Sequence, residues 1–120
     1  MARLSTDVIE KYKKLLQKDP HSLIFAALAD AYRENGNLQD AESLARQGVQ
    51  AHPQFSRGWV VLGRTLADRG QSDEALAVLE KAIRLEPDNL LAHQVTGDLH
   101  LTLKNSKDAL RSFKRVLFLN

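Results

Sequence analysis

The sequence predicts an all-α protein, a solenoid in which antiparallel helix hairpins are stacked one on the next. Three observations predict this fold class. Equivalent residues recur every 34 positions, as Ala41, Ala75 and Ala109 do. Apolar residues follow a helical period from Thr6 onward, and short turn signals interrupt that period at regular places. A repeat of this length is typical of helical arrays, whose extended faces bind other molecules more often than they catalyse reactions.

Seven helices are expected, at residues 6–18, 22–34, 38–51, 56–69, 72–85, 90–103 and 106–118. No segment alternates with the period of a strand. The first, fifth and seventh helices share one apolar pattern, which in the fifth consists of Ala75, Leu76, Leu79, Ala82 and Ile83. Because these helices share a face, they are expected to dock in equivalent ways.

Short turns separate the helices of each hairpin. Gly36 and Gly70 can adopt a positive φ and so end the helices that precede them. In the third hairpin Lys104 replaces this glycine, and Asn105 is expected to adopt the left-handed conformation instead. Three prolines stop helices just past their ends: Pro20, Pro53 and Pro87. Connections this short make the helices on either side antiparallel neighbours.

Composition narrows the class of protein. The chain has 120 residues, of which 43% are hydrophobic and 27% charged, as in one ordinary globular domain. It has no cysteine and a formal net charge of only +2, so disulfides and thiolate metal sites are excluded and a nucleic-acid partner is not indicated. No apolar stretch approaches the roughly 20 residues of a membrane span, and the start has no signal-peptide core. A cytoplasmic location is the expected default.

The repeated residues resemble the tetratricopeptide repeat family. The middle repeat carries the motif almost entire, in Trp59, Leu62, Gly63, Leu66, Ala75, Leu79, Ala82 and Pro87. The first repeat matches it with Phe25, Leu28, Ala29, Tyr32, Gly36, Ala41, Ala45, Gly48 and Pro53. The third is the most divergent, with His93, Thr96, Gly97, His100, Ala109, Phe113 and Val116. The resemblance covers essentially the whole chain.

This resemblance implies one domain over residues 1–120. Residues 5–20 form an N-terminal capping helix or half repeat, and the three repeats span 22–55, 56–89 and 90–120. The fold is expected to be a right-handed superhelical solenoid. Trp59 is expected to fill the space between successive hairpins. The last repeat halts one residue before the expected proline, which favours truncation of a longer repeat protein over an end that pairs with another copy.

The resemblance also implies a binding groove, because the first helix of each hairpin lines the concave face in this family. The expected groove residues are Leu23, Ala27, Asp30, Arg57, Val60, Val61, Arg64, Leu91, Gln94, Val95, Asp98 and Leu101. The apolar members are expected to be surplus to the packing of the repeats and therefore available to a partner. Asp30, Arg64 and Asp98 would set register and orientation through charge. The lysine, asparagine and arginine clamp with which co-chaperone members bind a carboxylate is absent at these positions.

Catalytic and metal chemistry are not indicated. His93 and His100 are seven residues apart on one helix, whereas a helical zinc pair is spaced i and i+4, so both are interpreted as core or half-buried residues. His21 and His52 flank prolines and are interpreted as capping or surface residues. No nucleophile elbow or phosphate-binding loop is present. We therefore expect no enzymatic activity, no cofactor and no metal.

The most favoured function is a non-catalytic scaffold that binds an extended or helical segment of another protein in the groove. The main alternative is self-assembly through the C-terminal face, for which the candidate residues are Phe113, Leu117 and Phe118. A third, less favoured, is RNA binding through two basic clusters: Lys11, Lys13, Lys14 and Lys18, then Lys104, Lys107, Arg111, Lys114 and Arg115. These clusters lack the aromatic residues that stack on bases, so a solvated helix face is the simpler interpretation. Membrane insertion is not expected.

Overall fold

The computed structural model describes residues 6–119, and within that range it contains seven helices and no strand. The helices are α1 (Thr6–Lys18), α2 (Phe25–Glu34), α3 (Leu38–Ala51), α4 (Ser56–Asp68), α5 (Ser72–Leu85), α6 (Leu90–Thr102) and α7 (Ser106–Leu119). The predicted all-α class is confirmed, and the expected helix bounds agree closely with those observed. Residues 1–5 and 120, where part of the predicted N-terminal cap and the last residue of the third repeat fall, lie outside the described range.

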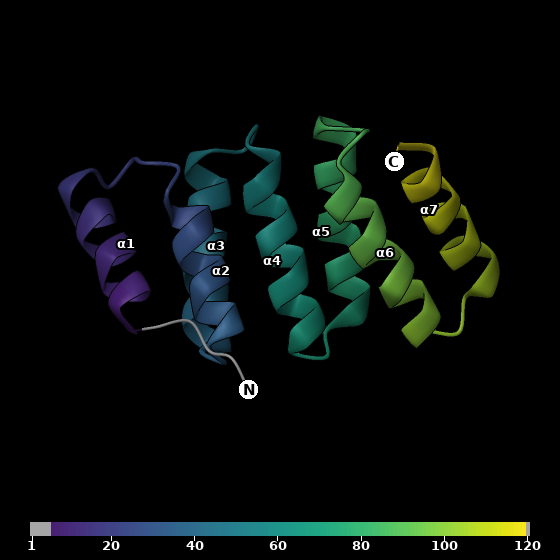
Figure 1. Ribbon diagram of the computed structural model, residues 1–120, viewed down its shortest axis with the longest axis horizontal. Helices are drawn as coiled ribbons and strands as arrows, with labels where there is room; N and C mark the ends of the chain where they lie inside the picture. The colour runs from purple at the N-terminus through teal and green to yellow at the C-terminus, as the bar shows by residue number, and fades with distance from the viewer. Residues whose placement is uncertain (1–5, 120) are drawn as a thin grey trace.

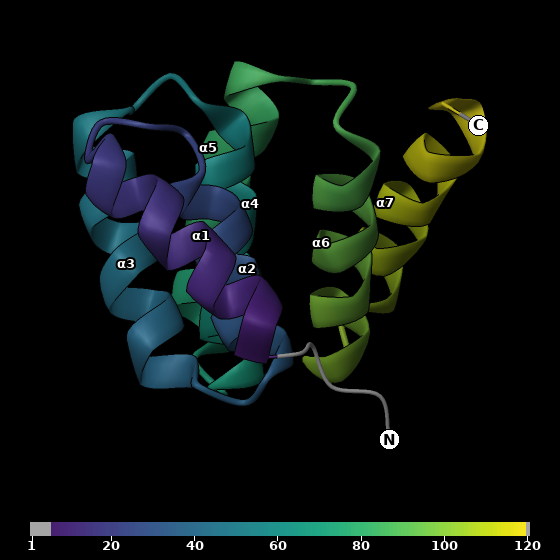
Figure 2. The ribbon, with the colours of Figure 1, turned by 60° about the vertical axis from the view of Figure 1, so that its left-hand side comes forward.

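The helices form three hairpins, α2–α3, α4–α5 and α6–α7, which stand side by side along the longest, 45 Å, dimension of the molecule (Figure 1). Each hairpin contacts the next through its second helix, because α3 packs on α4 and α5 packs on α6. The first helices also contact one another in the order α2, α4, α6. Among the described helices, α1 packs only on α2. In the rotated view the α6–α7 hairpin lies on the opposite side from α1 and α3 (Figure 2).

The start of α2 is later than the sequence predicts, at Phe25 rather than residue 22. The Oγ of Ser22 accepts a hydrogen bond from the Ile24 N–H at 3.1 Å, and the Ser22 N–H donates to the Asp19 carbonyl at 3.0 Å. These local bonds stabilise a turn, since short polar side chains compete with the helix for backbone groups. Leu23 therefore lies in this turn and not on a helix.

The turns inside the hairpins use a left-handed residue at one fixed position. Gly36 and Gly70 have φ of 85° and 81°, and Lys104 has φ of 62° at the same phase. The prediction that Asn105 would take this role is wrong. In the third hairpin the Asn105 N–H donates to the His100 carbonyl at 2.7 Å and the Lys104 N–H donates to the Leu101 carbonyl at 3.0 Å. The first two hairpins make the corresponding bonds, so the helix-ending motif fixes the left-handed residue whatever its type.

The core is made where hairpin helices approach closely. Leu62, Leu66 and Leu79 are fully buried, and Ala75 is buried beside them. A Cβ added at Gly63 would lie 2.7 Å from Cγ of Leu79, so only glycine fits there without a shift. Glycine at this position therefore allows the two helices of the hairpin to approach closely. A larger residue would overpack the contact, at a typical cost of about 1–3 kcal/mol.

Trp59 lies between hairpins, where it packs half-buried against two buried clusters. Its Nε1–H donates a hydrogen bond to the Pro53 carbonyl at 2.9 Å, and the ammonium of Lys81 lies 5.4 Å from its ring centroid. The indole thus joins the end of one repeat to the next. This is the position that the repeat spacing indicates.

Candidate functional site

The first helices α2, α4 and α6 together form one face of the array, which we call the groove face. It holds a pocket of about 330 Å³ between α4 and α6. The pocket is lined by Arg33, Arg64, Ala67, Asp68, Ser72, Val95, Asp98, Leu99 and Thr102. The three first helices supply all of these residues except Ser72, because the hairpin stacking places equivalent positions of successive first helices side by side.

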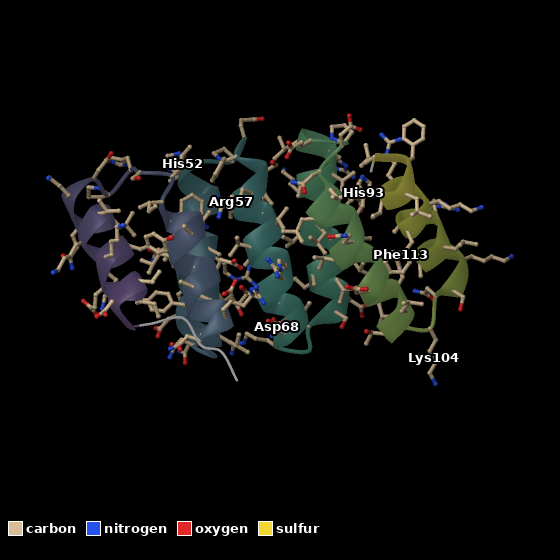
Figure 3. The ribbon with its side chains drawn as sticks, in the orientation of Figure 1. His52, Arg57, Asp68, His93, Lys104 and Phe113 are labelled. Atoms are coloured by element: carbon tan, nitrogen blue, oxygen red, sulfur yellow. The ribbon has the colours of Figure 1, made fainter. Side chains whose placement is uncertain are left out.

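A cluster of five charged residues lies in the C-terminal halves of α2 and α4 on the groove face. The Nε of Arg33 donates to Asp30 at 2.9 Å, and its Nη1 donates to Asp68 at 3.0 Å. Arg64 lies 3.6 Å from the same Asp30 carboxylate. Figure 3 labels Asp68 near one end of α4 and Arg57 toward the other. Arg33 also lies 3.7 Å from the Glu34 carboxylate, so two positive and three negative charges meet in this cluster.

This cluster stabilises the charged form of Arg33. Its side chain is only 12% exposed, and burial by itself would lower its pKa. The hydrogen bonds and charges of Asp30 and Asp68 outweigh burial, so the pKa of Arg33 is raised above its ordinary value. Arg33 is thus a fixed structural cation, bound to two carboxylates across two repeats, and is not free to bind an incoming anion.

The sequence placed Arg33 and Asp68 on the same helices as the groove residues but did not predict that they pair. The sequence does indicate one contact of this cluster, because Asp30 and Arg33 are spaced i and i+3 on one helix, where side chains meet. The contact of Arg33 with Asp68 joins residues 35 apart. It depends on the angle between hairpins, which the sequence pattern does not specify.

Two of the expected apolar groove residues are buried in the core. Val60 is 2% and Val61 3% exposed, and they belong to buried clusters that join α4 to its neighbours. The prediction that they are surplus to the packing is wrong. Helix α4 has hairpins on both sides, so its apolar positions are covered from both directions and little of them remains for a partner.

The remaining predicted residues fall into two groups by exposure. Arg57, Leu91, Gln94, Asp98 and Leu101 are exposed, and so is Leu23 in its turn. Ala27, Asp30, Arg64 and Val95 are half-buried. Arg57 and Asp98 make no ion pair within residues 6–119. The groove face therefore presents an internally paired charge cluster, one unpaired cation on α4, and one unpaired anion on α6 beside apolar side chains.

The histidines make structural contacts. His93 stands at the phase of Trp59, and its Nε2 lies 2.8 Å from the Pro87 carbonyl, matching the bond that Trp59 makes to Pro53. His52 stacks on Phe25 with ring centroids 5.8 Å apart. His93 and His100 are both half-buried, as predicted. The described residues contain no group of three His, Cys, Asp or Glu side chains arranged to hold a metal ion.

The three residues predicted as an assembly face do not share a surface. Phe113 is half-buried inside the hairpin, where a Cβ added at Gly97 would lie 2.6 Å from its ring (Figure 3). Its inclusion in an exposed face is therefore wrong. Leu117 and Phe118 are 75% and 78% exposed, and the Arg115 guanidinium lies 5.4 Å from the Phe118 ring centroid.

Comparison with known proteins agrees with this architecture. The model of the tetratricopeptide repeat family matches residues 9–54, 26–83 and 60–120. The solved structure of TTC0263, a thermophilic TPR protein in Thermus thermophilus, superposes with a TM-score of 0.84 at 24% identity, over 92% of this chain and 63% of that one. MamA from Desulfovibrio magneticus RS-1 gives 0.83 at 21% identity, over 95% of this chain and 65% of that one. At these identities the likeness concerns the fold alone.

Two curated relatives are much longer proteins. The human protein O-mannosyl-transferase TMTC3 is 28% identical over 102 residues, which is 83% of this chain and 11% of the relative. The Drosophila melanogaster protein O-mannosyl-transferase Tmtc2 is 36% identical over 73 residues, which is 60% of this chain and 8% of the relative. The match therefore spans only a small part of either protein. Among the described residues, none of the helices is long and apolar enough to cross a membrane.

Proposed function

Because the chain belongs to the tetratricopeptide repeat family, whose fold supports protein-interaction scaffolds, we propose that it binds a segment of another protein on its groove face. The observation that carries the proposal is the pocket between α4 and α6, which is lined by half-buried Val95 and unpaired Asp98. Exposed Leu91 stands one helical turn before Val95 on the same side of α6. Apolar side chains of the bound segment would cover Leu91 and the half-buried Val95. The chain acts without catalysis in this proposal.

Charge sets the orientation of the bound segment. The charges of the cluster around Arg33 are paired with one another, so Arg57 and Asp98 are the groups with charge to offer. A segment with an acidic residue toward Arg57 and a basic residue toward Asp98 would be complementary. Pairs of this kind contribute more to specificity and association rate than to affinity.

The test uses capture of a partner from source-cell extract by wild type and by the variants Leu91→Glu and Asp98→Lys. Both side chains are exposed, so the variants should remain folded, which circular dichroism checks. We expect the captured partner to fall at least tenfold with Leu91→Glu and severalfold with Asp98→Lys. Gln39→Glu, at an exposed position outside the groove face, is the matched control and should leave capture unchanged.

A photo-crosslinking residue locates the contact independently. Placed at exposed Gln94 on α6 it should label the partner, whereas at exposed Gln50 on α3 it should not. Equal labelling from both positions, or capture that Leu91→Glu leaves intact, would contradict the proposal. Val61 is unsuitable for this test although it was an expected groove residue, because a charge at a site 3% exposed would unfold the repeat.

A further inference from the structure

The outer side of α7 carries an exposed apolar strip with basic residues beside it. Leu110 is 56% and Leu117 75% exposed, although both belong to a helix whose other side is buried. Arg111 and Lys114 are exposed on the same helix. We call these four residues, Leu110, Arg111, Lys114 and Leu117, the end face.

The repeat itself indicates what kind of element covers such a face. One period earlier, the end-face positions are held by Leu76, Ala77, Glu80 and Ile83 of α5. Those four residues line a pocket whose opposite wall is Thr96 and His100 of α6. Two periods earlier Leu117 corresponds to Val49, which is 5% exposed and would lie 3.3 Å from a Cβ at Gly58 of α4. In both earlier hairpins the next first helix therefore covers the position of Leu117, fully at Val49 and partly at Ile83, while Ala77 and Glu80 remain exposed.

At the equivalent positions earlier in the array, one basic and one acidic side chain form ion pairs with the following hairpin, and their partners lie on α5 and in the α4–α5 turn rather than on the covering helix α4. Arg46 stands at the phase of Lys114, and it donates to Glu74 of the following hairpin at 2.7 Å. Glu42, at the phase of Leu110, lies 3.4 Å from Arg69 of that hairpin. Within the described part of the chain Lys114 makes no ion pair, and Arg111 lies 3.8 Å from the Asp108 carboxylate in a solvent-exposed pair, so both cations are available to carboxylates.

A second copy of the chain is a poor match for this face. Helix α7 carries four basic residues against one acidic residue, and α1, at the other end of the array, carries four against two. Stacking the two ends, or pairing two α7 helices, would bring positive charges together, and like charges across an interface cost affinity. Charge complementarity therefore favours an acidic partner over self-assembly.

We propose that the end face is a second docking site, which binds an acidic amphipathic helix of another protein. The apolar side of that helix covers Leu110 and Leu117, with small residues where Gly58 and Ala92 stand in the first helices of the chain's own repeats. Its glutamates or aspartates meet Arg111 and Lys114. This site is separate from the groove face and does not depend on the function proposed for that face.

The probe is a pair of synthetic helical peptides with the same leucine and alanine stripe, one flanked by glutamates and the other by lysines. Methyl-labelled protein is titrated with each peptide, and binding is measured by anisotropy of a fluorescent label. We expect the glutamate peptide to bind at least tenfold more tightly than the lysine peptide. It should shift the methyl signals of Leu110 and Leu117 and leave that of Leu91 on the groove face unchanged.

Variants separate this site from general charge attraction. Arg111→Glu with Lys114→Glu should weaken the glutamate peptide at least tenfold and strengthen the lysine peptide. Leu117→Ser should also weaken the glutamate peptide at least tenfold without unfolding, because the side chain is exposed. The matched control is Lys11→Glu with Lys14→Glu on α1, which makes the same change in net charge and should alter the affinity by less than twofold.

Five outcomes would overturn the proposal. Equal affinity for both peptides, or an equal loss with the α1 control, would mean nonspecific attraction. Methyl shifts at Leu91 rather than at Leu117 would place the peptide on the groove face. If light scattering shows a dimer and the Leu117 methyl is protected from a soluble paramagnetic probe, a second copy of the chain covers the end face. If the methyl is protected in a monomer, the chain itself covers the end face.

Discussion

The second and third hairpins, α4–α5 and α6–α7, share one backbone arrangement but differ in how well their side chains suit it. At equivalent positions the second has fully buried Leu66 and the third has His100, whose Nδ1 is buried without a hydrogen-bond partner. The second turns at Gly70, and the third forces Lys104 to a φ of 62°. The repeat phase thus sets the backbone, whereas stability depends on the residue at each phase and on whether a neighbour covers it.

The largest expected difference in stability between the two hairpins comes from whether neighbouring hairpins cover a side chain. Leu66 has hairpins on both sides and is fully buried, while Leu110 lies on the outer side of α7. We expect Leu66→Ala to lower the free energy of unfolding by about 2–5 kcal/mol, because it leaves a cavity. Leu110→Ala should change it by no more than about 0.5 kcal/mol. Urea denaturation followed by circular dichroism measures both, and similar losses would mean that α7 is covered.

A smaller difference in stability is expected from His100, which stands at the repeat position equivalent to Leu66. His100→Leu removes a buried ring nitrogen that lacks a partner, and such a group costs about 1–3 kcal/mol. We expect this variant to raise the free energy of unfolding by about 1 kcal/mol or more. The reverse exchange, Leu66→His, is the control and should lower it. A less stable His100→Leu protein would mean that an ordered water or another group satisfies the imidazole.

The smallest expected difference in stability comes from the left-handed turn residue, which is Gly70 in the second hairpin and Lys104 in the third. Lys104→Gly relieves a left-handed conformation that costs an L-residue about 1–2 kcal/mol, although glycine also loses more entropy on folding. We expect a gain near 1 kcal/mol in the free energy of unfolding. Gly70→Ala should lose a similar amount, through strain alone, because open space surrounds the added methyl group. Thermal unfolding of both variants compares the two turns, and an unchanged midpoint in Lys104→Gly would show that lysine carries no strain there.

The sequence by itself determined the helices, their pairing into hairpins, the packing role of Trp59 and the half-buried state of His93. These features follow from local rules, since apolar periodicity, turn residues and a fixed repeat length are all readable along the chain. It also placed Leu91, Gln94 and Asp98 on exposed positions of a first helix.

Only the tertiary structure decided which of the repeated positions are exposed. Val60 and Val61 are buried because α4 has neighbours on both sides. Leu117 is exposed, although its equivalent Val49 is buried and its equivalent Ile83 is half-buried. The same holds for Arg33, which the angle between hairpins brings to Asp68. A repeat pattern assigns each residue a direction on its helix, but burial and charge pairing also depend on what the neighbouring hairpin places opposite it.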